Sequence, residues 1–342
     1  MSRFRAQIAD AVRAVEILSP TRYSWLGEAS EPLPEHVERR IGADDARGYL
    51  VYSLESRLYS DFYCHGRAVA PAPPEPVDAV RGDAMLVEAL SHSNAGRGCW
   101  EPGWLLRRRD GDELVVERGG LTLRATPDEC RGLPSPDAVD VEIEVRYPKE
   151  LLRASPGFYM ALAERPFDDS EGLVRLYWNL APEGAVAFVS EATRLVGEAG
   201  FGARLKVAND PRLYDRCDAG VIYLPRAEAL RGGELVRSLH AAVAPMLRAP
   251  VPAFTKRVAA GVGLAEDPGG GQSFGQARCH VVAEALVGAY ERGIGDHAGR
   301  VAAVRDRMLE EGLDPDAPYL RPGASDDYEP LRIDERPGTL AG

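Results

Sequence analysis

The strand-like segment LVRLYWNL, at 173–180, places chemically useful side chains on one of its two faces. Because side chains alternate along a strand, Arg175, Tyr177 and Asn179 point to one side and apolar residues point to the other. A cation, a phenol and an amide on one face can bind an anion and hold a proton beside it. An amphipathic strand with its polar side in water is an equally good interpretation of this segment alone.

The next strand-like segment along the chain repeats this arrangement with two cations. Arg204 and Lys206 share one face, and Arg212 and Arg216 follow closely. Like charges at this density repel one another, and a bound anion such as phosphate would offset the repulsion. The alternative is that nearby aspartates neutralise the arginines in surface ion pairs. These aspartates are Asp210, Asp215 and Asp218.

A glycine-rich loop at 267–273 leads into a helix-like segment at 274–291. The free N–H groups and the dipole at a helix start can bind an anion, and Arg278 near the first turn favours an anion there. Lys256 and Arg257 precede the loop and are further candidates for contacting phosphate or peptide. The loop has neither Walker spacing nor GxGxxG after a strand, so a mononucleotide site is not predicted. A structural turn is an equally good interpretation.

Lysine is scarce in this chain, and its three positions therefore carry information. Lys149, Lys206 and Lys256 are the only lysines among 41 basic residues. Arginine is the better clamp for phosphate because it stays charged and binds with two nitrogens, whereas lysine can lose a proton. Neighbouring guanidinium charges and partial burial both lower the pKa of a lysine toward the range of a general base. The residues thus predict an arginine-lined anion site in which Lys206 takes an α-proton while phosphate departs.

That chemistry is a β-elimination. Phosphoserine would give dehydroalanine and phosphothreonine would give dehydrobutyrine, with an acid protonating the bridging oxygen. Lys149, which follows Tyr147 and Pro148, has a surface explanation and no assigned role.

Composition excludes several other classes of function. The net charge of −12 argues against a nucleic-acid binder, which normally has a basic excess. The five cysteines show no zinc spacing and are typical of reduced thiols in a cytoplasm, so neither a metal nor another cofactor is expected. No apolar run of membrane-spanning length and no signal-peptide pattern occurs. We expect a cytoplasmic, globular protein without a membrane partner.

The order of elements predicts an α+β fold with a mixed or antiparallel sheet and flanking helices. Proline-rich runs at 71–76 and 133–138 mark breaks between regions. Expected helices lie at 3–18, 43–62, 183–199, 227–248 and 274–291, and expected strands at 139–147, 173–180, 204–208 and 220–224. Between 83 and 127 we expect short β runs that include Met85 to Val87, with a hairpin turn at 109–112. The expected regions are an N-terminal helical segment (1–76), a small β-rich module that could bind peptide (83–132), a catalytic domain (139–311) and a loosely ordered tail (312–342).

Several segments together resemble the HopA-type effector family. They are YSDFYCHG (59–66), RLYWNL (175–180), KVANDP (206–211), DAGVIYL (218–224), FTK (254–256) and GGGQSFGQARC (269–279). The resemblance covers most of the chain from about 50 to 290. The family was first named from plant-pathogen type III effectors, and its actinobacterial members stand in clusters that make class V lanthipeptides and thioamitides. It is similar, distantly, to the phosphothreonine lyase effectors.

The resemblance implies an activity, partners and roles for particular residues. The protein would remove phosphate from a precursor peptide that a separate aminoglycoside-phosphotransferase-like kinase has phosphorylated. Lys206 matches the lysine base of the lyases, and Arg216 matches their phosphate-binding arginine. In the lyases, a histidine on the upstream strand acts as the general acid. The corresponding strand of this sequence has no histidine, so Tyr177 is the first candidate acid and His280 the alternative. A non-catalytic phosphopeptide- or leader-binding adaptor for the kinase, and a secreted lyase acting on host phosphoproteins, are the alternative functions.

Overall fold

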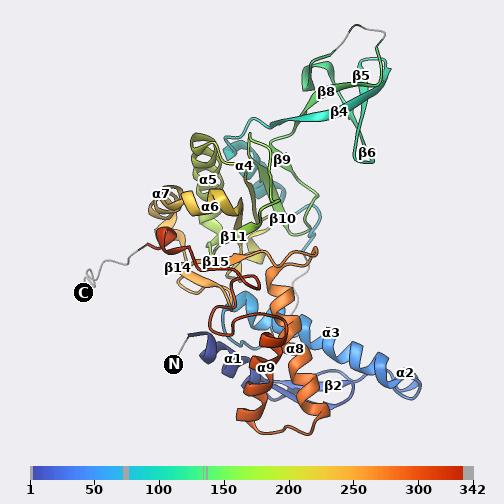
Figure 1. The fold of residues 1–342 in the computed structure, drawn as a ribbon, viewed down its shortest axis with the longest axis vertical. Coiled ribbons are helices and arrows are strands. Elements are labelled where there is room, and N and C mark those ends of the chain that lie inside the picture. The colour runs from blue at the N-terminus through green and yellow to red at the C-terminus, as the bar shows by residue number, and fades with distance from the viewer. Residues whose placement is uncertain (1–2, 72–76, 134, 136–137, 334–342) are drawn as a thin grey trace.

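The computed structural model describes residues 3–71, 77–133, 135 and 138–333. Most of the first proline-rich break and part of the second lie outside the described residues, as does the chain after 333. The described part forms a central sheet with helices on it, a helical region at one end and a small β module at the other (Figure 1). Within it, no helix is long and apolar enough to span a membrane.

The central sheet has seven strands in the order β14-β15-β11-β13-β12-β10-β9, and every described pairing between them is antiparallel. This confirms the α+β class. The strands are β9 (Glu150–Leu151), β10 (Phe158–Leu162), β11 (Leu173–Trp178), β12 (Arg204–Ala208), β13 (Gly220–Pro225), β14 (Lys256–Ala259) and β15 (Val262–Glu266). The expected strands at 173–180, 204–208 and 220–224 are three adjacent members of it.

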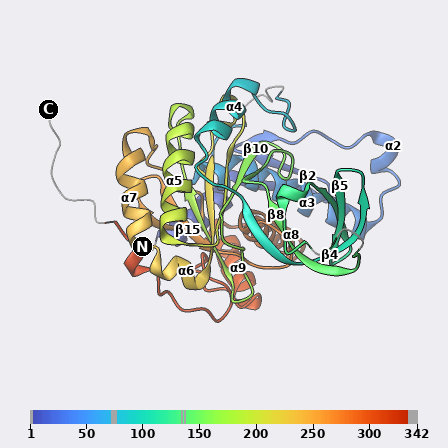
Figure 2. The same cartoon turned by 90° about the horizontal axis from the view of Figure 1, so that it is seen from above.

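Helices cover one face of this sheet. The main ones are α5 (Ala185–Ala199) and α7 (Gly233–Val243), which lie side by side, with the short α6 (Arg226–Arg231) next to them (Figure 2). An apolar stripe on α5, including Phe188 and Ala192, is fully buried against the strands. The α5 helix ends where Gly200 takes a left-handed conformation with φ of 63°, as its sequence predicts.

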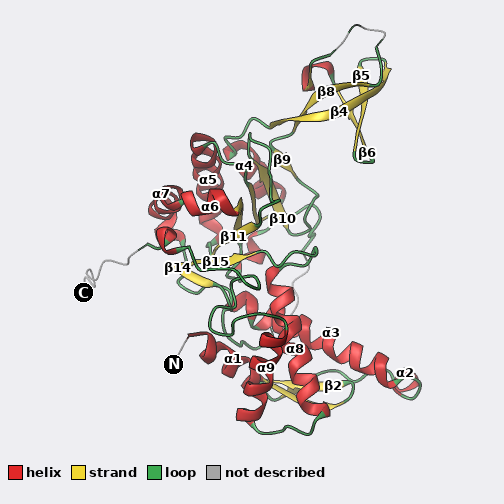
Figure 3. Ribbon diagram, in the orientation of Figure 1, coloured by secondary structure: helices red, strands yellow, loops and turns green. Residues whose placement is uncertain are grey.

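A helical region packs below the sheet around a small three-stranded sheet (Figure 3). Its elements are α1 (Arg3–Ala14), β1 (Val15–Ser19), β2 (Arg22–Trp25), β3 (Glu28–Ala29), α2 (Glu35–Glu38), α3 (Ala43–Asp61), α8 (Phe274–Glu291) and α9 (His297–Glu310). Helices α3 and α8 pack against each other, and their buried residues are continuous with the core of the large sheet. The first helix is shorter than expected, because the chain turns at Ala14 into β1.

The β module projects from the rest of the protein (Figure 1). Its strands are β4 (Cys99–Asp110), β5 (Glu113–Arg118), β6 (Leu121–Ala125), β7 (Cys130–Arg131) and β8 (Val141–Tyr147). It has a separate apolar cluster centred on Trp104 and Leu106. The predicted hairpin turn is confirmed, since Asp110 pairs with Glu113 across Gly111, whose φ is 64°.

Met85 to Val87, expected as a β run, lies instead in helix α4 (Ala84–Ser93). The reason is local: the carboxylate of Asp83 accepts a hydrogen bond of 2.8 Å from the N–H of Leu86 and so caps a helix start.

The tail also differs from the expectation of loose order, as far as residue 333. Leu313, Tyr319 and Leu331 are buried in the main core. The buried carboxylate of Glu266 accepts hydrogen bonds from the Tyr328 hydroxyl (2.6 Å) and the Arg321 N–H (2.9 Å). Apolar burial and these hydrogen bonds to the end of β15 hold the tail, and neither is visible in a Pro- and Asp-rich composition.

Candidate functional site

Lys206 and Tyr177 lie on the same face of the sheet, away from α5 and α7. Lys206 pairs with Val221, which in turn pairs with Tyr177, so two strand spacings of about 4.8 Å each separate the two backbones. One step along the strands, Arg204 pairs with Tyr223 and Tyr223 with Arg175. The polar faces predicted for the two segments therefore form one surface.

The ammonium group of Lys206 rests on aromatic rings. Its Nζ lies 4.2 Å from the ring centre of Phe158 and 5.8 Å from that of Tyr223. Rings at these distances attract a cation and hold it in place. Among the described residues, no carboxylate or other group is within hydrogen-bond distance of Nζ, and the side chain is partly exposed. The two rings thus fix the position of the Lys206 amine, while its hydrogen-bonding capacity is unused within the described chain.

Arg216 lies beside Lys206 and is held by a buried carboxylate. Its Nε and Nη2 donate to the two oxygens of Asp218 at 2.5 and 2.8 Å, and its guanidinium lies 5.6 Å from the ring centre of Phe158. Burial raises the pKa of the Asp218 carboxyl, but the charge and hydrogen bonds of Arg216, assisted by Lys206, outweigh it and lower the pKa overall. Asp218 is 6% exposed and Arg216 25%, so a buried carboxylate fixes an arginine whose side chain is partly exposed.

The other two arginines of this face differ in their availability. Arg175 is bonded to Asp267 through Nε (2.7 Å) and Nη2, and its side chain is 12% exposed, less than the 25% of Arg216. Arg204 is exposed, with its guanidinium 4.4 Å from the ring centre of Phe167, and it has no ion pair within the described chain. Arg204 and Lys206 are therefore the two cations of this face that have no carboxylate bonded to them within the described chain.

Two predicted phosphate contacts have structural partners instead. Asn179 donates to the carbonyl of Pro250 (2.9 Å) and is 3% exposed. Arg278 is also 3% exposed and donates to the carbonyls of Pro318 (2.7 Å) and Leu320 (2.9 Å). Both side chains hold neighbouring segments of backbone. Arg212, whose neutralisation by an aspartate was the alternative interpretation, pairs with Asp210 at 2.7 Å.

Lys256 and Arg257 lie away from Lys206, at the far edge of the sheet. Lys256 donates to Asp326 in the tail at 2.5 Å. The register connects it across the sheet with residues of the helix-covered face: Leu264, Leu176, Ile222 and Leu205. Four strand spacings and the opposite orientation thus separate it from Lys206. The sequence did not reveal this, because strand order is a tertiary property.

His280, the alternative acid, lies on the side of α8 that meets α3. Its Nδ1 is 3.0 Å from a carboxylate oxygen of Glu55, and no contact joins it to the described residues of the Lys206 face. The start of α8 is closed by a capping box, in which Ser273 and Gln276 satisfy each other's N–H groups.

The match with a protein family spans this sheet. The profile of the HopA1 effector protein family matches residues 150–320, which is half of the chain. The chain belongs to the HopA1 effector protein family. The matched HopA1 region includes every strand of the central sheet, and with them Lys206, Arg216 and Asp218.

Two solved structures of effector proteins are similar to the chain. The effector protein from Pseudomonas syringae pv. tomato strain DC3000 has a TM-score of 0.44 at 17% identity, covering 79% of this chain and 95% of that one. The effector protein from Pseudomonas syringae pv. syringae strain 61 has a TM-score of 0.46 at 13% identity, covering 93% and 97%. A search of curated proteins found no match.

Sequence reasoning missed several residues around Lys206 in the HopA1 region and the helix beside it. Phe158 supports both Lys206 and Arg216, yet it begins a strand that the sequence did not predict. Asp218 was considered only as a surface partner for arginine. Tyr59, at the end of α3, accepts a hydrogen bond of 3.2 Å from Arg216. Its position within YSDFYCHG, a segment of the resemblance, was the available signal.

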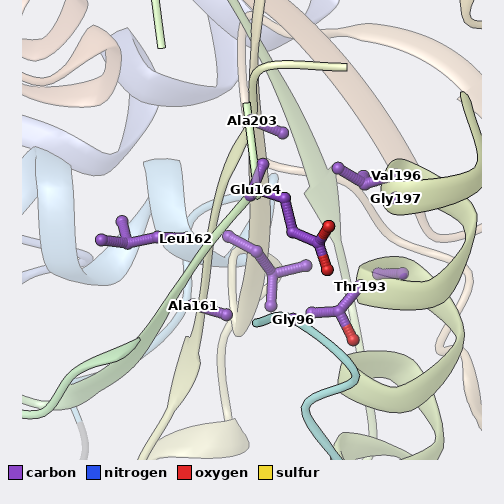
Figure 4. Close-up of a pocket in the computed structure, with 11 residues that line it drawn as sticks. Gly96, Ala161, Leu162, Glu164, Thr193, Val196, Gly197 and Ala203 are labelled. Atoms are coloured by element: carbon purple, nitrogen blue, oxygen red, sulfur yellow. The ribbon is translucent and has the colours of Figure 1, made fainter. Parts of the chain in front are cut away.

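A small cavity lies on the opposite face of the HopA1 sheet, between α5 and β10 (Figure 4). Ala161, Leu205, Thr193 and Val196 are among its lining residues, and its volume is about 20 Å³. That is room for roughly one water molecule, so it does not accommodate a phosphopeptide. Among the described residues, no group of three or more His, Cys, Asp or Glu is placed to hold a metal ion.

Proposed function

We propose that this protein is a lyase that eliminates phosphate from phosphoserine and phosphothreonine residues of a ribosomally made precursor peptide. The observation that carries the proposal is the position of Lys206: a lysine with no carboxylate bonded to it in the described structure, beside an arginine that Asp218 fixes. An amine in such a place can remove a proton, and the fixed guanidinium can hold a phosphate.

In the proposed reaction, the phosphate of the substrate binds to Arg216, with Arg204 adding to the attraction. The α-carbon of the same residue then lies against the amine of Lys206, which takes its proton. The electrons of that C–H bond form the double bond between the α- and β-carbons, and the bond from the β-carbon to oxygen breaks. Phosphate leaves from the guanidinium that bound it, and the peptide retains a dehydroamino acid.

The substrate and partner follow from the chemistry and from the resemblance to family members that work on precursor peptides. An elimination of phosphate needs a phosphorylated peptide, so a separate aminoglycoside-phosphotransferase-like kinase would act first. Both steps would take place in the cytoplasm, where the kinase has ATP. No cofactor is needed, since the base and the phosphate clamp are side chains of this chain.

The decisive experiment is mass spectrometry of a synthetic phosphoserine peptide incubated with the protein. Loss of the mass of phosphoric acid is expected, together with the ability of the product to add a thiol at the new double bond. Loss of HPO₃ alone would identify a phosphatase, and binding without a change of mass would identify an adaptor. A preference for folded phosphoproteins over an unstructured peptide would favour an effector lyase that acts on a host.

A further inference from the structure

The hydroxyl of Tyr177, the first candidate acid, is closed off from the surface. Tyr177 is 3% exposed, and its oxygen is fully buried. The ring of Tyr63 meets the ring of Tyr177 edge-on, with 6.4 Å between the ring centres. Tyr63 in turn packs against Phe274 at the start of α8. A substrate on the Lys206 face therefore cannot receive a proton directly from Tyr177.

A different tyrosine reaches the phosphate clamp. Tyr59 is the last aromatic residue of α3, is partly exposed, and is stacked on Tyr63 with 5.4 Å between ring centres. Its ring centre is 6.0 Å from the guanidinium of Arg216, and its hydroxyl oxygen is 3.2 Å from Nη2 of that arginine. The phenol is thus next to the place where we expect phosphate to bind.

The direction of this hydrogen bond determines where the phenolic proton points. A guanidinium only donates, so the Tyr59 oxygen is the acceptor and its own O–H is directed elsewhere. Among the described residues, no acceptor lies within hydrogen-bond distance of that O–H. An oxygen of a phosphate bound to Arg216 would be such an acceptor. Burial raises the pKa of Tyr59 well above its ordinary value, so the proton is present until a substrate arrives.

We propose that Tyr59 is the catalytic acid of the elimination, an inference that rests on the proposed lyase function. Lys206 first takes the α-proton, which leaves a carbanion stabilised by the neighbouring carbonyl; the bond between the β-carbon and the bridging oxygen then breaks, and the proton of Tyr59 passes to that oxygen. Hydrogen phosphate leaves, and the phenolate remains against the positive charge of Arg216. Lys206, now an ammonium, returns a proton to the phenolate through solvent, which restores both groups.

The test compares Tyr59→Phe with Tyr177→Phe, using a phosphoserine peptide. Phenylalanine keeps the ring stacked on Tyr63 and removes only the hydroxyl. We expect kcat of Tyr59→Phe to fall by about 10²- to 10⁴-fold, the usual contribution of a general acid, while its Kd for the peptide and its melting temperature stay close to those of the wild type. Tyr177→Phe should retain most of the activity, because its hydroxyl does not reach the substrate.

Two further measurements separate an acid from a residue that only shapes the site. In D₂O, Tyr59→Phe should still exchange the α-proton of bound peptide, since Lys206 is intact, whereas Lys206→Ala should not. Replacing Tyr59 with 3,5-difluorotyrosine should shift the basic limb of the pH–rate profile to lower pH, following the lower pKa of the fluorinated phenol.

The outcomes are distinguishable. Wild-type kcat in Tyr59→Phe, a raised Kd as its only defect, or a large loss in Tyr177→Phe instead would each overturn the assignment of Tyr59 while leaving the lyase function in place. A wild-type protein that binds the phosphopeptide without eliminating phosphate would overturn the lyase function, and this inference with it.

Discussion

Lys206 and Arg216 place their cationic groups over the same aromatic ring, that of Phe158, at 4.2 and 5.6 Å from its centre. The two cations come from β12 and from the loop that follows it, so the ring of β10 sets their spacing across strands. Of the two, only Arg216 has a bonded carboxylate. This division matches two tasks: a fixed charge holds phosphate, and a free amine takes a proton.

Lys206→Ala should abolish elimination and leave binding largely intact. Removing a general base typically lowers the rate by about 10²- to 10⁴-fold, and the phosphate would still be held by Arg216. Initial rates from mass spectrometry and Kd from fluorescence anisotropy would measure the two effects. Lys149→Ala is the matched control, because the Lys149 amine donates to the carbonyls of Ser91 (2.8 Å) and Asn94 (3.1 Å), near helix α4. Full activity in Lys206→Ala would rule out its role as the base.

Arg216→Ala should weaken phosphopeptide binding. Removing one partner of a hydrogen-bonded charge pair costs at least about 2 kcal/mol, or about 30-fold in Kd. The unphosphorylated peptide should show no comparable change. Arg212→Ala in the same loop is the control, since Arg212 is exposed and pairs with Asp210. Equal Kd values for Arg216→Ala and the wild type would remove Arg216 from the phosphate site.

Asp218→Asn should lower the free energy of unfolding at neutral pH. It should also make the stability of the protein less dependent on pH in the acid range. The folded pKa of Asp218 is lowered, so its contribution is present above the unfolded pKa of about 3.9 and is lost as pH falls through the lower folded value. At pH 7 the variant leaves Arg216 without its carboxylate, at a cost of about 3 kcal/mol. Urea unfolding of the wild type and of Asp218→Asn, at pH 7 and near pH 3, should show a gap between their free energies of unfolding that is smaller at the acid pH. A gap independent of pH would contradict a charged Asp218.

Local signals in the sequence predicted the ends of two helices and the polar face of one strand of the central sheet. The α8 helix starts at the predicted residue because Ser273 and Gln276 form a capping box, and α5 ends at the predicted Gly200. Alternation placed Arg204 and Lys206 together on one face of β12, as the structure has them. These features depend on neighbours within a few positions, which a sequence displays.

The partners of those side chains were not predictable in the same way. Strand order puts Lys256 at the sheet edge on the covered face, and no local pattern encodes strand order. Phe158 acquires its role only when β10 pairs with β12. The phenol of Tyr59 meets Arg216 across 157 positions of sequence. Contacts between residues far apart in the sequence therefore determine which of the predicted residues lie together in the candidate site.

Arg278 has two competing interpretations, a contact to bound phosphate or a structural role within the fold. The sequence predicts a phosphate contact, whereas the structure shows a buried guanidinium that donates to the carbonyls of Pro318 and Leu320. Burial lowers the pKa of Arg278 to about 10, and within the described chain no carboxylate is bonded to it. The guanidinium therefore holds the tail in place through these two hydrogen bonds, and burying its charge costs part of the free energy that the bonds contribute.

Arg278→Met should accordingly loosen the tail without changing phosphopeptide affinity. Two charge-assisted hydrogen bonds would be lost, each worth about 1.5–3 kcal/mol, and relief of the buried charge offsets part of that loss. We expect a net destabilisation of about 1–3 kcal/mol and faster proteolysis between 313 and 333, followed by mass spectrometry of the fragments. The Kd of the phosphoserine peptide should match the wild type, in contrast to Arg216→Ala. A raised Kd with an unchanged cleavage rate would return Arg278 to the phosphate site, because only a side chain free of the Pro318 and Leu320 carbonyls could reach a bound phosphate.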